Sequence, residues 1–222
     1  MNAAHILMPT LRIPDVSLAQ RVCKCILHTL IYLRSMGPTK SIQEQLDGLD
    51  ITYSRCDHVD FCRAVDAAVE QLPTTASTDV KRSATIFKVS FSERVVSNAF
   101  IFRRESLLPW ELWTLPIEIA SSNWTRTTTE ERQEAFACLE RELRFYMALM
   151  ASVADANQHY IPPLTTRDRV PFPCDIKVQP AVEPVLAVDT VVEALAQTLR
   201  PAFFTCSTTP RSSSMSGSSY SQ

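Results

Sequence analysis

The chain has 222 residues, a length that allows one large domain or two small ones with enough residues to bury a sizeable core. Its formal net charge is −2, so it lacks the basic field that nucleic-acid binding needs, and we expect no nucleic-acid partner. It has only three glycines, so the glycine-rich phosphate loops of P-loop and dinucleotide-binding enzymes cannot be built.

The first third of the chain predicts two strands and two helices in alternation. Residues 10–13 predict a short strand, and residues 18–36 place their apolar side chains at helical spacing, with Gly37 as the C-cap. Residues 49–55 alternate between apolar and polar side chains, which is typical of a strand. Asp57 is expected to cap a second helix, whose apolar stripe comprises Val59, Cys62, Val65, Val69 and Leu72.

The centre of the chain is dominated by a strand that contains two of the three tryptophans. Residues 84–93 predict the strand before it, because Phe, Val and Phe alternate with Lys and Ser. Residues 107–119 then alternate, with Trp113, Leu115, Ile117 and Ile119 on one side, which indicates a strand with one buried face. Pro116 cannot donate to a sheet, so we expect an edge, a bulge or a donor position that faces away from the neighbouring strand.

The last third begins with the strongest helix signal. Thr128 and Glu131 form a capping-box pattern, and the apolar stripe that follows predicts one long helix over residues 129–157. Residues 172–178 predict one more strand, and residues 185–199 are compatible with a helix between two prolines.

We expect one ordered domain over residues 1–204 and a disordered Ser-rich tail over residues 205–222. No apolar run approaches the ~20 residues of a membrane-spanning helix, and residues 1–8 lack the features of a signal peptide. We therefore expect a cytoplasmic protein without a transmembrane segment, whose seven cysteines are reduced thiols.

Two groups of cysteines are close enough in sequence to be candidates for chemistry. Cys23 and Cys25 are too close together for a zinc knuckle, and one of the two lies on the apolar stripe of the helix, which favours core packing. Cys56, His58 and Cys62 cluster in sequence, but no second cluster offers a fourth ligand. We predict no catalytic residues, no metal and no cofactor. The alternative is a cysteine-dependent α+β enzyme, although no local nucleophile motif supports a Cys/His triad.

Several stretches resemble the autophagy-related protein 101 family, and they occur in the family's order. The Pro-Trp-Glu-x-Trp pattern from Pro109 to Trp113 is similar to a strand of that family, and the residues at the end of the first helix resemble its first long helix. The similar stretches are residues 26–35, 49–53, 107–114, 159–163 and 170–173.

This resemblance implies an α+β fold, a HORMA domain with a mainly antiparallel sheet and three helices packed on one face. It also implies a non-catalytic adaptor subunit of the autophagy-initiating kinase complex, found at the phagophore assembly site. The partner that it implies is the HORMA domain of autophagy-related protein 13, bound as a heterodimer and stabilised by the pairing. Tyr32, Leu33 and Tyr53 are large side chains that we expect near this interface.

Animal members of the family carry a Trp-x-Phe finger before the tryptophan strand, which recruits downstream autophagy factors. Counted back from Trp110, those two positions fall on Ile101 and Arg103, so the finger's Trp is missing. We expect Phe100, Ile101 and Phe102 to form the recruitment finger instead. The alternative is that these residues continue the preceding strand and pack inward.

Overall fold

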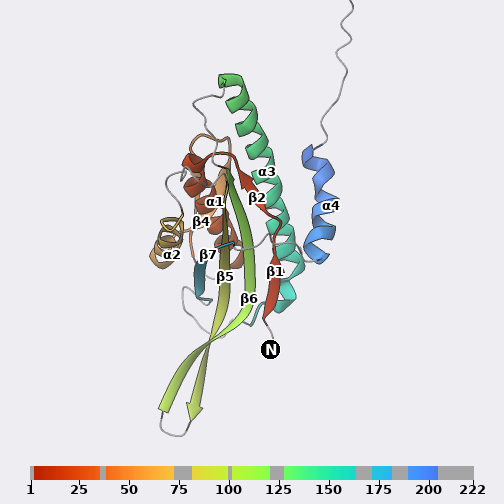
Figure 1. Ribbon diagram of the computed structural model, residues 1–222. Helices are drawn as coiled ribbons and strands as arrows, with labels where there is room; N and C mark the ends of the chain where they lie inside the picture. The colour runs from red at the N-terminus through yellow and green to blue at the C-terminus, as the bar shows by residue number, and fades with distance from the viewer. Residues whose placement is uncertain are drawn as a thin grey trace, which may run out of the picture.

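The computed structural model describes residues 3–35, 39–72, 82–99, 102–120, 128–163, 172–181 and 190–204. Within these ranges the chain forms a main sheet, a separate two-stranded sheet and four α-helices (Figure 1). The predicted α+β class is confirmed. The boundary expected at residue 204 stays a prediction, because residues 205–222 lie outside the described residues.

The main sheet is built around two long strands, β5 (Arg82–Ala99) and β6 (Phe102–Ala120), which pair with each other in antiparallel fashion. On its other edge β5 pairs with β7 (Cys174–Pro180), also antiparallel. On its other edge β6 pairs in parallel with β1 (Ala4–Leu7) and then with β2 (Leu11–Ile13). The sheet is therefore mainly antiparallel, as predicted, with parallel strands at one edge.

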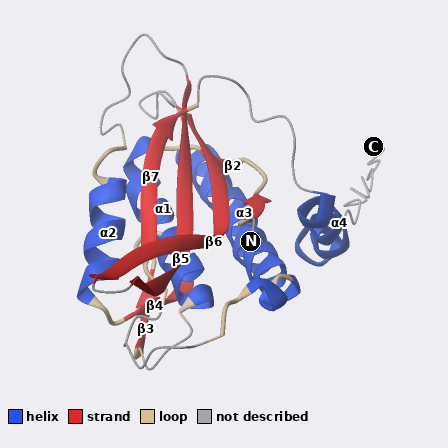
Figure 2. Ribbon diagram, turned by 90° about the horizontal axis from the view of Figure 1, so that it is seen from below, coloured by secondary structure: helices blue, strands red, loops and turns tan. Residues whose placement is uncertain are grey.

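Three helices form a layer against this sheet. α1 (Val16–Arg34) lies in the middle of the layer, between α2 (Val59–Val69) and α3 (Thr129–Ala156) (Figure 2). α4 (Thr190–Phe204) packs on α3, on the side away from α1. A short 3-10 helix, η2 (Gln158–Tyr160), follows α3.

The small sheet pairs β3 (Ser41–Gln45) with β4 (Thr52–Cys56) in antiparallel register, and β4 packs against α1. Residues 49–55 were expected to form the strand, which instead starts three residues later. β1 and β3 were not predicted, because each is short and neither has a run of alternating apolar residues.

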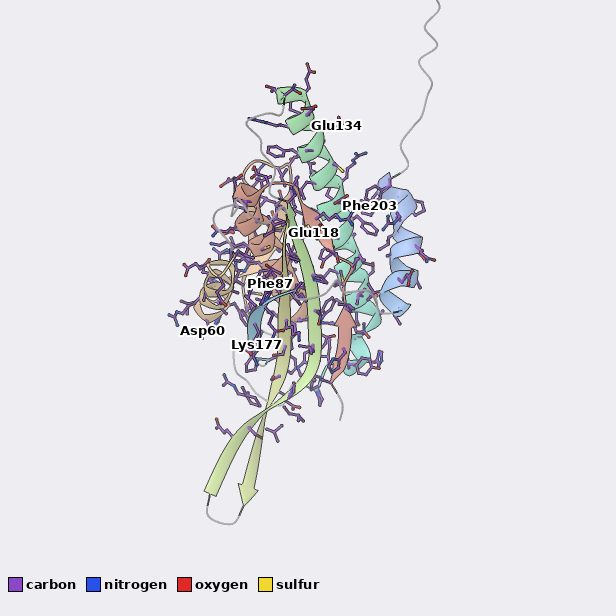
Figure 3. All side chains as sticks on the ribbon, viewed as in Figure 1. Asp60, Phe87, Glu118, Glu134, Lys177 and Phe203 are labelled. Atoms are coloured by element: carbon purple, nitrogen blue, oxygen red, sulfur yellow. The ribbon has the colours of Figure 1, made fainter. Side chains whose placement is uncertain are left out.

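The buried face of the main sheet supplies much of the core. Trp113, Leu115, Ile117 and Ile119 are all buried, which confirms the alternation predicted for β6. They lie beside Phe87, Val89 and Phe91 of β5, which are also buried (Phe87 is labelled in Figure 3). Together these side chains give the helix layer a continuous apolar surface to pack on.

Pro116 sits inside β6 without breaking the sheet. The carbonyl of Thr114 accepts a hydrogen bond from the Met8 N–H, so the backbone groups of Thr114 face β1. Residues two apart in a strand direct their backbone groups to the same side, so Pro116 faces the break between β1 and β2. Pro116 has no backbone N–H, and at this break no described strand residue is paired with it that would accept a hydrogen bond. This corresponds to the predicted alternative in which the donor position faces away from a neighbouring strand.

The predicted start of one helix is confirmed, and three other predicted helix ends differ from the structure. The Thr128–Glu131 capping box is present, with N–H···O distances of 3.2 and 2.8 Å, so the predicted start of α3 is confirmed. α2 begins after His58 with no side-chain cap, so the cap predicted at Asp57 was wrong. α4 continues through Pro201 because its last residues pack on α3, so its predicted end at residue 199 was wrong. α1 ends at Arg34 with Ser35 as its C-cap, so the C-cap predicted at Gly37 was wrong.

Candidate interaction site

β5 and β6 continue well beyond the rest of the sheet. β7 pairs with β5 only as far as Phe91, whereas residues 92–99 and 102–109 go on pairing with each other as a two-stranded ribbon. We call these two segments the ribbon. Figure 1 shows it projecting past the helix layer as a single arm. The strand predicted over residues 84–93 was thus correct in place and too short.

The end of the ribbon coincides with the predicted recruitment finger. Ala99 pairs with Phe102, so Phe100 and Ile101 are the two residues between the strands. Phe100 and Ile101 lie outside the described residues, and Phe102 is described through its backbone, which begins β6. The role expected of these three residues stays a prediction.

The ribbon leaves the sheet at a β-bulge. Phe91 is opposite Glu111 and Ser92 is opposite Pro109, so Trp110 is an extra residue on β6. The N–H of Ser92 donates instead to the carbonyl of Pro173, at 3.0 Å. A bulge bends the strand and increases its twist. The bulge therefore changes the direction of the ribbon just beyond the pair of Phe91 with Cys174, the last pair between β5 and β7 on this side.

Aromatic packing holds the bulge in place. The buried ring of Trp110 lies 6.0 Å from the ring of Phe91 and 5.3 Å from that of Phe172, centroid to centroid. The guanidinium carbon of Arg34 lies 6.0 Å from the Trp110 ring and 5.7 Å from the Trp113 ring. Both distances are within the range of a cation–π contact, so the guanidinium charge packs against two aromatic rings at the base of the ribbon.

That charge belongs to a buried ion pair between Arg34 and Glu111. Nη2 and Nε of Arg34 donate to the two carboxylate oxygens of Glu111 at 2.6 and 2.8 Å. Nη1 donates to the carbonyl of Ala154 at 2.9 Å, and the indole N–H of Trp113 donates to Glu111 at 2.8 Å. Arg34 is the last residue of α1 and Ala154 lies near the end of α3. The pair thus ties both helices to β6 beside the bulge.

Electrostatics at this pair is dominated by its isolation from water, since both side chains are fully buried. Burial raises the pKa of the Glu111 carboxyl, while the Arg34 charge and the donor on Trp113 act in the opposite direction. Sequence reasoning missed this pair, although Glu111 lies two residues before Trp113 and so shares its buried face. Its partner is 77 residues away, and no local pattern announces it.

Two large apolar side chains are exposed at the root of the ribbon. Leu107 is 60% exposed and Leu108 is 45% exposed, and they pair across the ribbon with Arg94 and Glu93. Because the two leucines are adjacent in a strand, they project to opposite faces of the ribbon. Both faces of the arm therefore offer apolar surface next to charge.

The three residues predicted at the partner interface do not share one surface. Tyr32 is 42% exposed, and Leu33 is half-buried, lining a pocket of about 130 Å³ with Asp155 and other residues of α3. Tyr53 is buried, stacks on His28 at 6.3 Å and donates its hydroxyl hydrogen bond to a carboxylate of β3 at 2.9 Å. Its place in an interface, like that of the other two, stays a prediction.

The described cysteines are mostly shielded from chemistry. Burial raises the pKa of Cys25 and of Cys174 to about 12, and it also raises the pKa of Cys23 and Cys56. The thiolate is the nucleophile, so these four positions do not support the cysteine-dependent alternative. Within the described ranges, His, Cys, Asp and Glu side chains do not gather in threes that could hold a metal ion. None of the described helices is both long and apolar enough to cross a membrane.

Comparison with known proteins places these features in a wider group. A family model described as "Autophagy-related protein 101" matches residues 14–168, more than half of the chain. The matched span runs from the start of α1 past the end of α3 and contains the ribbon, Arg34 and Glu111. Autophagy-related protein 101 of Arabidopsis thaliana is 20% identical over 184 residues, covering 77% of this chain and 85% of that protein.

Proposed function

The chain belongs to the autophagy-related protein 101 family, and from this membership we propose that it is a non-catalytic adaptor subunit of the autophagy-initiating kinase complex. An autophagy-related role follows from the family itself. In the proposal the chain is a HORMA domain that forms a heterodimer with the HORMA domain of autophagy-related protein 13 and stabilises it. It acts in the cytoplasm, at the phagophore assembly site, during autophagosome assembly.

We further propose that the ribbon recruits downstream autophagy factors through Phe100, Ile101 and Phe102. The observation that carries this proposal is the ribbon's projection beyond the helix layer, with its last described pair at Ala99 and Phe102 (Figure 1). A two-stranded ribbon is only marginally stable on its own, so a bound partner would stabilise it. Aromatic side chains beside arginine are enriched at the energetic centres of interfaces, and Arg103 and Arg104 follow directly.

The pairing surface proposed for the partner HORMA domain is centred on Tyr32 and Leu33. Tyr32 is exposed near the end of α1, and the pocket beside Leu33 offers a cavity for a partner side chain. Asp155 in the same pocket would favour a cationic group on that partner. Tyr53 packs against α1 through its stack on His28, one helical turn before Tyr32.

The recruitment finger is tested with the double variant Phe100→Ala, Phe102→Ala in the full chain. We expect an unchanged melting curve and retained binding of the partner HORMA domain, together with loss of downstream factors in a pulldown. Tyr160→Ala is the matched control, since Tyr160 is an exposed aromatic residue outside the ribbon. A loss of several kcal/mol of stability, as buried Phe→Ala changes give at about 3–5 kcal/mol each, would mean that the two residues are core.

The pairing is tested by mixing the chain with the purified partner HORMA domain and measuring the melting temperature. We expect an increase, because a ligand at 100 times its Kd stabilises the native state by about 2.7 kcal/mol. Tyr32→Glu should abolish the increase, whereas Val59→Glu, at an exposed position on α2, should keep it. An unchanged melting curve with a folded partner would refute the pairing. It would not decide the proposal about the recruitment finger, which is tested by the separate pulldown of downstream factors.

A further inference from the structure

A groove on the far side of the molecule from the ribbon is not used by the proposed function. It lies between β2, the end of β6 and the first half of α3, and its volume is about 290 Å³. Ile13 and Leu139 supply buried apolar wall. Ala120, Ala135 and Cys138 are small, half-buried side chains in the same lining, so they leave room for larger side chains of a bound segment.

The groove is one part of a longer stripe along α3. Ala135, Cys138, Glu142 and Phe145 are three or four residues apart, so they share one face of the helix. The first three line the groove. Phe145, one turn further on, is buried, and its ring lies 5.8 and 5.6 Å from the rings of the two phenylalanines that end α4, centroid to centroid.

α4 shows what kind of segment this stripe accepts. It is a helix whose apolar residues face α3, with Val192 buried and Leu195 and Leu199 partly buried. The guanidinium carbon of Arg200 lies 5.5 Å from the ring of Phe145, so a cation accompanies the apolar face. Figure 1 shows α4 ending short of the start of α3, and the residues that line the groove include none from α4.

The groove also carries a negative charge that a cation would neutralise. Glu118 accepts a hydrogen bond from Arg12 at 3.1 Å, so its charge is compensated within the chain. Glu142 instead faces a neutral group, the thiol of Cys138, with Sγ 3.9 Å from its carboxylate oxygen. Among the described residues no Lys or Arg forms an ion pair with Glu142. A half-buried carboxylate beside an apolar wall favours a partner that brings its own cation.

We propose that this groove is a second docking site, which binds an amphipathic basic helix of a partner protein. Apolar side chains of that helix fill the space beside Ala135 and Cys138, and one of its arginines or lysines binds Glu142. The helix lies on α3 in line with α4, and together they cover the stripe as far as Phe145. Because the ribbon is at the opposite end of β6, both sites can be occupied at once.

The probe is a synthetic helical peptide of about 14 residues, or four turns, with leucines along one face and arginines beside them. A matched peptide carries glutamate in place of each arginine. The full chain is alkylated with N-ethylmaleimide, and peptide mass mapping gives the rates at Cys138 and at Cys62, a half-buried cysteine of α2. At about ten times its Kd the arginine peptide should slow alkylation of Cys138 about tenfold, because about a tenth of the sites stay free. Cys62 should react as before, and the glutamate peptide should protect neither cysteine.

Matched variants locate the peptide. Ala135→Arg fills the groove and adds a cation, so it should abolish the protection of Cys138. Ala137→Arg is the control, since it makes the same change at an exposed position of α3 outside the groove, and it should keep the protection. Glu142→Gln hardly changes the volume of the wall and should weaken binding of the arginine peptide about two- to fivefold, as expected for a half-exposed ion pair. Melting curves show that the variants fold.

Three results would overturn the proposal: equal protection by the two peptides, equal protection of Cys62, or full protection in Ala135→Arg. Protection of Cys138 that rises with protein concentration in the absence of peptide would also overturn it, and would assign the groove to a second copy of this chain. None of these measurements uses the partner HORMA domain, so their outcome is independent of the proposed function.

Discussion

Replacing Arg34 by leucine should destabilise the protein more than any surface change, because it leaves the buried carboxylate of Glu111 without its cationic partner. In the native chain Glu111 receives two hydrogen bonds from Arg34 and one from Trp113, and the Ala154 carbonyl receives another from Arg34. Arg34→Leu removes three of these four bonds and the only charge in contact with the carboxylate among the described residues. Removing one partner of a buried pair costs about 3–5 kcal/mol, and we expect a loss in that range.

Urea unfolding followed by tryptophan fluorescence measures this loss, because Trp110 and Trp113 both lie beside the guanidinium. Arg12→Leu is the matched control, since it removes a solvated pair with Glu118 and should cost less than about 1 kcal/mol. The double variant Arg34→Leu, Glu111→Met should recover much of the loss, because no buried charge remains. A cost below 1 kcal/mol for Arg34→Leu, or simple additivity in the double variant, would refute the reasoning.

The pH dependence of that loss provides a second check on its cause. Without Arg34, the effect of burial on Glu111 is opposed only by the hydrogen bond from Trp113, so the folded-state pKa lies further above the unfolded value than it does in the parent chain. The native state then binds the proton more tightly than the unfolded state, and stability falls as the pH rises between the two pKa values. The difference between Arg34→Leu and the parent chain should therefore narrow as the pH is lowered towards about 4.5.

Two further predictions concern the helices. Burial lowers the pKa of His28 below its ordinary value. The charges of Arg55 and Lys24 lower this pKa further, whereas those of Glu44 and Asp66 raise it. The stability present above the unfolded pKa of about 6.5 should thus be lost as the pH falls from there through the lower folded-state pKa of His28. His28→Phe, measured by urea unfolding at several pH values, should reduce this dependence of stability on pH, and an unchanged dependence would contradict the reasoning. Thr128→Ala removes the side-chain acceptor of the capping box and should cost about 1 kcal/mol in the same assay. Thr198→Ala, at an exposed position inside α4, should cost less, and equal costs would contradict the role of the box.

Local patterns were sufficient for the elements whose signals are themselves local. The capping box and the apolar stripe of α3 depend on residues a few positions apart, and the alternation from Trp113 to Ile119 depends on every second residue. Those parts of the fold could be predicted from the sequence alone. The resemblance to the family could be found for the same reason, because its motifs are short.

Features that arise from distant contacts could not be predicted. The ribbon's true length depends on β5 and β6 pairing beyond the bulge at Trp110, and the bulge interrupts the period-two pattern on which strand prediction depends. α4 continues past Pro201 because Phe203 and Phe204 contact a ring on α3. In the sequence, Arg34 has the pattern of a polar residue at a helix end, and only the folded chain places Glu111 beside it.

The parallel strands at the edge of the sheet have a consequence for synthesis. β1 is made first, yet its register partner for Ala4 is Glu111, so the residue that completes this pairing is made 107 positions later. β5 and β6, in contrast, are joined by two residues and can pair as soon as both exist. Contacts of small sequence separation form fastest, so the β5–β6 hairpin should be the template on which the N-terminal strands later assemble. Until then β1 and β2 lack their partner strand on the nascent chain, and transiently unpaired strands of this kind are prone to aggregate.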